Sequence, residues 1–319
     1  MATNGPDYKN QADELRDVLK DKAFDVEHAL DLYAKSFVTL PAFAIYEDAC
    51  VAPLLPQIAD CHIYLIGLTP KIDVVGVELR NNELIAKFLI LGTTYELNWK
   101  VPIGTILCGD GDTGWHVQLP NGERYVPNEK NISDRLVQEH NAVDFKVVYI
   151  GQAFGADGSR NALDRLKKHE TLQKIAVKGI PDGYRLTILM LAIEPGNTLI
   201  TLFNPFAKDN LHGDERIGNG LDKLFGTNEA ERTTLYEASL IRYFQPPYNK
   251  EFRDSFPSTN MKLLADCYKK DFSAIIAEIC IDELPFVLFS DVVGHKIYHV
   301  AKHDLHTDDA RNMFFSMGK

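Results

Sequence analysis

The segment from residue 228 to residue 244 constrains this chain most, because it reads as a helix with a carboxylate on its packed face. The positions that recur at the spacing of that one face are Ala230, Thr234, Glu237, Ile241 and Phe244. Four of these five are apolar or small, so the face should pack on a sheet. A carboxylate there is costly unless a metal, a cation or hydrogen-bond donors neutralise it. Pro246 and Pro247 end the helix, because neither can donate the next backbone hydrogen bond.

The charge of the chain is unevenly distributed. Its 319 residues carry a net charge of −11, and residues 1–144 hold 22 acidic and 12 basic side chains, whereas residues 145–254 are near neutral. The acidic total argues against a generic nucleic-acid-binding protein, but a neutral segment can still present a local basic groove to phosphates. No apolar run is long enough to cross a bilayer, so we expect no membrane partner. Five widely spaced cysteines without a CxxC pair favour reduced thiols and a cytoplasmic protein.

The hydrophobic pattern predicts an α+β protein of three domains. Residues 1–130 should form a helical lead-in and a β-rich domain that is regulatory or senses the target, residues 131–254 a central domain, and residues 255–319 a small α/β extension. Asn81-Asn82 and Asn121-Gly122 are typical of hairpin turns. In the first domain we expect helices at 11–20 and 26–37, and strands at 62–68, 74–79, 83–91, 94–101, 115–119 and 123–126.

The rest of the chain alternates strands and helices. A long polar, glycine-rich segment at 205–226 is predicted as a surface loop, and loops of this length are often functional. We expect helices at 128–141, 228–244 and 261–269, and strands at 145–150, 184–193, 198–203, 274–281, 286–289 and 296–300.

A strand, a loop of small residues and a short helix follow one another between residues 145 and 169. Asn161 is suited to cap the helix, on which Arg165 and His169 share one face at i, i+4. A guanidinium offers a fixed fork of donors to a phosphate. A carboxylate facing the same cleft could hold Mg²⁺ with few protein ligands and several waters. With a Tyr or His as base, these groups would suffice to hydrolyse a phosphodiester.

In these residues the chain resembles the GIY-YIG nuclease superfamily, over about residues 143–250. The second signature tripeptide is present as Tyr149-Ile150-Gly151. Arg165 and His169 match the R-x-x-x-H arrangement of the following helix, Glu237 matches the metal-binding glutamate, and Asn249 in Pro246-Pro247-Tyr248-Asn249 matches the asparagine after it. The first tripeptide is not recognisable ahead of residue 145, and Tyr125 is the counterpart we consider for its tyrosine.

The resemblance implies a small central antiparallel sheet flanked by helices, and a metal-dependent endonuclease that cleaves nucleic acid, with DNA expected. Glu237 would hold Mg²⁺ (or Mn²⁺), Arg165 would stabilise charge on the phosphate, and Tyr149 or His169 would orient or deprotonate water. Asn249 completes the implied site. The architecture suggests by analogy a role in restriction or anti-phage defence. The acidic N-terminal domain suits a protein partner or self-association.

Two other interpretations stay open at the level of sequence. In the first, the GIY-YIG-like module is catalytically degenerate and binds a nucleic acid, a nucleotide or a partner protein. The absence of the first tripeptide favours it. In the second, the protein is an oligomeric scaffold in which Glu237 and Arg165 merely pair in the core.

Two further clusters have ordinary structural explanations. His295, His299, His303 and His306 could bind zinc on a helix, but the segment reads as a strand, which favours a polar edge or a pH-sensitive surface. Asp110-x-Asp112-x-Gly114 is similar to the start of a calcium loop but lacks the later glutamate, so we expect a turn.

Overall fold

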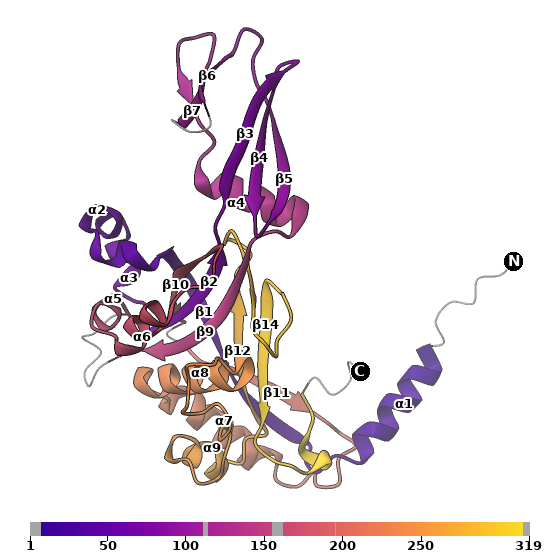
Figure 1. Cartoon of the computed structure of the whole chain (residues 1–319). Coiled ribbons are helices and arrows are strands. Elements are labelled where there is room, and N and C mark those ends of the chain that lie inside the picture. Colours follow the sequence, from indigo (N-terminus) through magenta and orange to yellow (C-terminus); the bar gives the residue numbers. More distant parts are fainter. Residues whose placement is uncertain (1–7, 111–113, 155–161, 195, 315–319) are drawn as a thin grey trace, which may run out of the picture.

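One mixed sheet of eight strands forms the body of the protein (Figure 1). The computed structural model describes residues 8–110, 114–154, 162–194 and 196–314. The strand order is β13-β9-β2-β10-β1-β12-β14, and β11 pairs with the first half of β1. The strands are β1 (Val26–Pro41), β2 (Ile63–Pro70), β9 (Asp144–Gln152), β10 (Tyr184–Ile193), β11 (Thr198–Phe203), β12 (Ala274–Cys280), β13 (Val287–Phe289) and β14 (Tyr298–Asp304).

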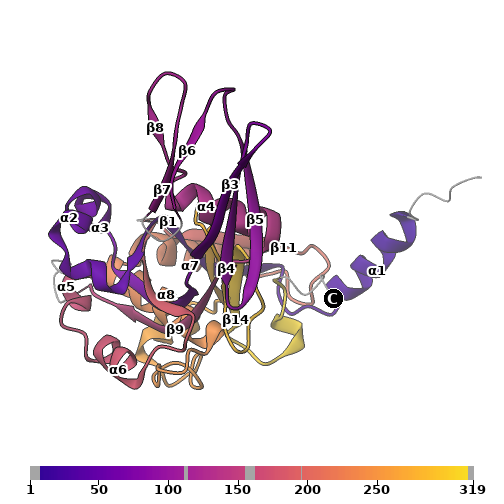
Figure 2. The same cartoon turned by 45° about the horizontal axis from the view of Figure 1, so that its top comes forward.

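Two three-stranded sheets stand away from this body, as Figures 1 and 2 show from two directions. The first contains β3 (Asp73–Arg80), β4 (Glu83–Ile90) and β5 (Thr93–Lys100), and the second contains β6 (Ile106–Asp110), β7 (Gly114–Gln118) and β8 (Arg124–Tyr125). The two-residue turn Asn81-Asn82 has positive φ at both residues, and Gly122 also has positive φ, which confirms both predicted hairpins. Both sheets lie in the segment between β2 and β9.

The longer helices are α1 (Tyr8–Lys20), α4 (Glu129–His140), α6 (Glu170–Lys178), α7 (Gly213–Gly226) and α8 (Glu229–Phe244). The predicted helix at 128–141 is confirmed as α4, whose first turn is capped by Asn128 and which ends at Asn141 in the left-handed conformation. Asn228 caps α8 in the same way. The short helices are α2 (Asp48–Val51), α3 (Leu55–Ile58), α5 (Ala162–Leu166) and α9 (Ala265–Lys269). No helix of the described ranges is long and apolar enough to cross a membrane.

Two predicted elements are wrong. Residues 26–37 were expected to form a helix but belong to the central strand β1, whose first seven residues are all buried. A strand covered on both faces shows no alternation, so its apolar spacing imitates a helix. The segment 205–226, expected as a loop, contains α7, which packs on β1 and β11 and buries the charged side chains of Arg216 and Lys223.

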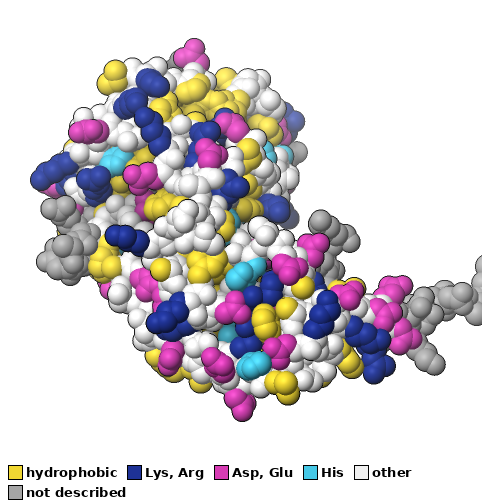
Figure 3. All heavy atoms as spheres, turned by 90° about the horizontal axis from the view of Figure 1, so that it is seen from below, with side chains coloured by type: hydrophobic (Ala, Val, Ile, Leu, Met, Phe, Trp, Pro, Cys, Tyr) yellow, Lys and Arg dark blue, Asp and Glu magenta, His cyan; other side chains and the backbone are white. Residues whose placement is uncertain are grey.

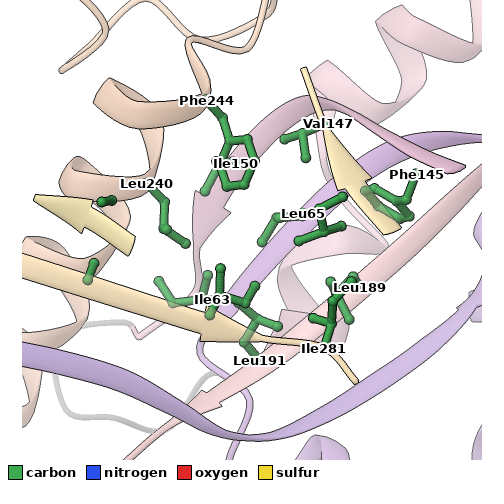
Figure 4. Close-up of a cluster of buried hydrophobic side chains, with 14 of the residues drawn as sticks. Ile63, Leu65, Phe145, Val147, Ile150, Leu189, Leu191, Leu240, Phe244 and Ile281 are labelled. Atoms are coloured by element: carbon green, nitrogen blue, oxygen red, sulfur yellow. The ribbon is translucent and has the colours of Figure 1, made fainter. Parts of the chain in front are cut away.

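The hydrophobic core lies between the large sheet and α8. Figure 4 shows Leu240 and Phe244 of α8 directed at apolar side chains of β2, β9 and β10, of which Ile63 and Ile150 are fully buried. Burying a side chain of this size contributes about 1.5–3 kcal/mol. A second apolar cluster joins α5 and α6 to the sheet through Leu166. Together these clusters fix α8 and the α5–α6 segment against β2 and β9.

The fold is α+β, as predicted, but its main sheet is not small or purely antiparallel. β1 pairs with β12 in parallel, and β9 pairs with β13 in parallel. The segments 1–130, 131–254 and 255–319 all contribute strands to this one sheet, so the boundaries near 130 and 254 do not divide it.

Candidate active site

Two paired strands and one helix meet at an open stretch of β9. Strand β2 runs antiparallel to β9 and places Tyr64 opposite Gly151. On its other side β9 pairs with β13 only over residues 144–146, so the stretch from Val148 to Gln152 forms an edge of the sheet. Edge strands expose unpaired backbone groups that a neighbouring segment can use. The residues that resemble a nuclease site gather around this edge.

Tyr64 and Tyr149 form an aromatic pair on one side of the edge. Their ring centres are 6.2 Å apart, and Tyr64 is almost completely buried. A Cβ added at Gly151 would lie 2.5 Å from the Tyr64 hydroxyl oxygen, so only glycine fits opposite this ring. Burial raises the pKa of both tyrosines, and the charge of Arg165 opposes that rise. Both hydroxyls are therefore protonated at neutral pH.

The segment His62-Ile63-Tyr64 brings a second tyrosine to the Tyr149-Ile150-Gly151 strand. It lies on the strand that pairs with the Tyr149-Ile150-Gly151 strand, and its tyrosine faces that strand's glycine. The sequence reading missed it because both small sheets and α4 are inserted between β2 and β9. The idea that Tyr125 is the counterpart is wrong. Tyr125 lies on β8, in the separate second small sheet, and is exposed.

His169 is not on the same helix as Arg165, contrary to the prediction. Helix α5 ends at Leu166, and His169 caps the first turn of α6 by accepting a hydrogen bond at Nδ1 from the Leu172 backbone N–H, at 3.2 Å. The neutral ring therefore carries its proton on Nε2. Burial, with the charge of Arg165, lowers the pKa of His169 to about 4. The ring lies 5.0 Å from that of Tyr149. Asn161, the expected cap, lies outside the described residues.

Arg165 supplies the positive charge of the site. Its side chain is exposed on α5, and its charge favours the ionised forms of Tyr64, Tyr149 and Glu237, whose pKa values it lowers. It also hydrogen-bonds with the Tyr64 hydroxyl, which again lowers the pKa of that group. The guanidinium is therefore near both tyrosines and the glutamate while its exposed face can meet an anion.

Glu237 is the buried carboxylate that the helix pattern predicted. It is 9% exposed, and burial together with the negative charge of Glu251 raises its pKa to about 8. Gln152 opposes this rise by donating hydrogen bonds from its side chain and its backbone N–H. The cost of the carboxylate is thus offset by these donors and by a bound proton at neutral pH. A divalent cation would have to displace that proton.

Asn249 hydrogen-bonds to the edge of β9, so its side-chain amide is not free to bind a ligand in the cleft. Its Oδ1 accepts from the Ile150 N–H at 2.9 Å, and its Nδ2 donates to the Ile150 carbonyl at 2.8 Å. The Tyr248 N–H donates to the Val148 carbonyl at 3.2 Å, so this segment continues the edge pairing that β13 begins. Asn249 is therefore a positioning residue, and both sides of its amide are occupied.

A cleft of about 280 Å³ opens beside Tyr149 and Glu237, and Asn249 and Glu251 also line it. Two carboxylates and space for several waters fit a hard divalent cation, which needs few protein ligands. Among the residues that the structure describes, no group of three or more His, Cys, Asp or Glu side chains is placed to hold a metal. A cation at this cleft would therefore depend on Glu237, with Glu251 as the nearest second carboxylate, and on water.

The C-terminal histidines do not converge. His299 bonds to the Lys296 carbonyl, His303 to the Ser239 carbonyl and His306 to the Phe272 carbonyl, while His295 lies 3.2 Å from Asp144. His299 and His303 are buried, so this strand is not the polar surface that its histidines suggested. They are core residues with satisfied rings. Of the calcium-like pattern, Asp112 lies outside the described residues.

The structure thus brings Tyr149, Glu237 and Asn249 to one cleft and sets Arg165 and His169 beside its aromatic wall. Sequence reading missed Tyr64, Gln152 and Glu251. Gly151, two residues after Tyr149, was the signal in the sequence: a glycine at this point of a strand indicates that a bulky side chain lies opposite it on the neighbouring strand. The chain matches no protein-family model, no curated protein and no solved structure.

Proposed function

We propose that this protein is a divalent-cation-dependent endonuclease of the GIY-YIG type, which hydrolyses phosphodiester bonds of nucleic acid. One observation carries the proposal: the pairing of β2 with β9 sets Tyr64 against Gly151 beside the same cleft that Glu237 enters from α8. A tyrosine hydroxyl and a buried carboxylate that line one cleft, with an exposed arginine charge near both, are the groups that metal-assisted hydrolysis needs.

A cation held by Glu237 would neutralise charge on a phosphate oxygen and lower the pKa of a bound water. Arg165 pairs with another phosphate oxygen through its exposed guanidinium. The Tyr149 hydroxyl, which lines the cleft, orients the attacking water, and the charge of Arg165 favours the ionised form of Tyr149 that would accept the proton of that water. The buried Tyr64 hydroxyl hydrogen-bonds with Arg165 and positions the guanidinium.

His169 has a different role from the one we expected. Its Nδ1 lone pair is used by the cap of α6, so it is not the base that deprotonates water. It keeps its ring against Tyr149 and offers Nε2–H as a donor, which positions the tyrosine.

The test is cleavage of supercoiled plasmid, single-stranded DNA and RNA, with Mg²⁺ or Mn²⁺ and with EDTA. Glu237→Gln keeps the shape of the side chain and removes the ligand charge, while Glu283→Gln removes an exposed glutamate away from the cleft. We expect cation-dependent cutting that is retained in Glu283→Gln and reduced at least a hundredfold in Glu237→Gln. Equal cutting by the two variants would refute the assignment.

The second candidate function is binding without cleavage. It is favoured by the proton that Glu237 retains at neutral pH and by the raised pKa of both tyrosines. Tight binding of nucleic acid with no cutting in the presence of either cation, at any pH up to 9, would support this second candidate function. The defence role and the partner of the acidic N-terminal segment rest on analogy and are part of the proposal.

A further inference from the structure

A groove with basic walls continues directly from the Glu237 cleft. It has a volume of about 460 Å³ and shares Lys174, Tyr248 and Lys250 with the cleft. Lys146 and Lys178 line it as well, and none of its lining residues within the described ranges is Asp or Glu. The groove is therefore locally positive, although the chain carries a net charge of −11.

The lysines of this groove are available to an anion. Lys174, Lys178 and Lys250 are exposed and form no ion pair with any side chain in the described ranges, whereas Lys146 pairs with Asp291 at 2.5 Å. Lys174 and Lys178 lie at i, i+4 on α6 and so project from one face. On the face drawn in Figure 3, basic and acidic side chains are interspersed. Lys178 lies over the ring of Tyr248, 5.3 Å from its centre, and three lysines without an ion pair in the described ranges are a local feature that suits phosphates.

The groove adjoins an apolar cavity at Pro181, which lines both. This cavity has a volume of about 420 Å³, and Phe43, Tyr46 and Tyr184 line it with Ile180. Phe43 and Tyr46, from the 3-10 helix η1 (Ala42–Tyr46), are 64% and 57% exposed. Two exposed aromatic rings that line one apolar cavity, in contrast to a single exposed ring on a flat surface, form a candidate binding surface.

The edges of the aromatic cavity are also basic. Lys71 and Arg185 both line it, Arg185 also pairs with Glu129 at 2.9 Å, and Asp182 is the one acidic residue among the lining residues that the structure describes. Aromatic faces beside Lys and Arg are the combination that takes an unstacked base and its phosphate. A duplex keeps its bases stacked inside and would present no ring to such a cavity.

We propose that a single-stranded nucleic acid lies along this path, with its phosphates on Lys174, Lys178 and Lys250 and an unstacked base in the aromatic cavity at Phe43. The proposal deepens the proposed function, on which it rests in taking the Glu237 cleft as the end of the path where the strand is cut. It identifies the substrate as a single strand or a single-stranded arm. A second copy of this chain seated on the aromatic cavity is the competing occupant.

The test measures binding in EDTA, so that it does not depend on cutting. Fluorescence anisotropy is followed with one labelled single-stranded DNA, the RNA of the same sequence and the blunt DNA duplex. The variants are the double variant Lys174→Glu/Lys178→Glu and Phe43→Ala. Their matched controls are the double variant Lys262→Glu/Lys269→Glu and Phe225→Ala on α7, which alter exposed residues outside the path.

We expect single strands to bind at least tenfold more tightly than the duplex. Phe43→Ala should weaken single-strand binding about tenfold, as loss of one stacked base does. The double lysine variant should weaken it more and reduce the slope of log affinity against log salt by about 1 to 2. Both controls should bind like the wild type. Comparison of the affinities for the single-stranded DNA and the RNA then shows which of the two the protein prefers.

Three results would overturn the proposal. The first is a failure of the wild type to bind single strands. The second is an affinity for single strands that the two path variants and the two controls weaken to the same extent. The third is a dimer, found by light scattering at the assay concentration, that Phe43→Ala dissociates. Single-strand binding as expected without Mg²⁺-dependent cutting would overturn the proposed nuclease activity and leave the binding path standing. Mg²⁺-dependent cutting that is equal in the wild type, in Phe43→Ala and in the double lysine variant would overturn the binding path and leave the proposed nuclease activity standing.

Discussion

The buried carboxylate Glu237 predicts an unusual dependence of stability on pH. Its folded-state pKa is about 8 against an ordinary value of 4.5. Between these two values the folded protein binds a proton that the unfolded chain has already lost, so stability must fall as pH rises through this window. Each pH unit costs about 1.4 kcal/mol, and the whole window costs on the order of 5 kcal/mol.

The perturbation that isolates this cost is Glu237→Gln, which keeps the volume and the hydrogen-bonding shape but cannot ionise. Wild type and variant are unfolded in urea, in EDTA, at a series of pH values from 5 to 9. We expect the two to be similar near pH 5 and the variant to be more stable by several kcal/mol at pH 9. Asp31, whose pKa is raised to about 7 by burial and by Glu278, titrates in both proteins and cancels in the difference.

A divalent cation should reduce this difference, because binding to Glu237 replaces the proton. At pH 8 we expect Mg²⁺ at a hundred times its dissociation constant to stabilise the wild type by about 2.7 kcal/mol and to leave Glu237→Gln unchanged. Parallel pH profiles of the two proteins in EDTA would refute the reasoning, since they would show that Glu237 is not held protonated in the folded state.

Three further substitutions separate catalysis from structure. Arg165→Lys should reduce cleavage about a hundredfold with an unchanged unfolding midpoint, because a point charge cannot replace the guanidinium fork; an unchanged cleavage rate would contradict this. Asn249→Ala leaves the N–H and carbonyl of Ile150 unpaired, so urea unfolding should show a loss of about 2–4 kcal/mol, and a loss below about 1 would contradict it. Gly151→Ala forces a Cβ onto the buried tyrosine hydroxyl opposite and should cost about 1–3 kcal/mol, whereas Gly218→Ala, with no atom within 4 Å of its added Cβ, should be neutral or stabilising.

Local signals predicted the elements that local chemistry controls. Asn128 and Asn228 cap α4 and α8 because an asparagine side chain satisfies a free N–H of the first turn. Asn81-Asn82 forms its turn because asparagine tolerates positive φ. Glu237 is buried as the apolar pattern predicted, but Ala230 of that pattern is exposed and every residue of α8 from 235 to 241 is buried, so helix periodicity alone does not define its face.

Features that depend on the rest of the fold could not be predicted from local sequence patterns. Tyr64 reaches Gly151 only through the pairing of β2 with β9, which residues 71–143 separate in the chain. The spacing of strand β1 imitates a helix because helices pack against the strand and its first seven residues are all buried, which removes the alternation. His169 lies near Arg165 across the break between α5 and α6 and not on one helix with it, which the i, i+4 spacing did not indicate.

The rate of Mg²⁺-dependent cutting of a labelled single-stranded DNA, measured in a single turnover for wild type and Glu237→Gln, tests the central claim most directly. Circular dichroism and the urea midpoint at pH 6 establish that both proteins are folded. We predict cutting by the wild type that rises with pH towards 8, as Glu237 loses its proton, and no measurable cutting by the variant. Equal rates for the two folded proteins would contradict the account.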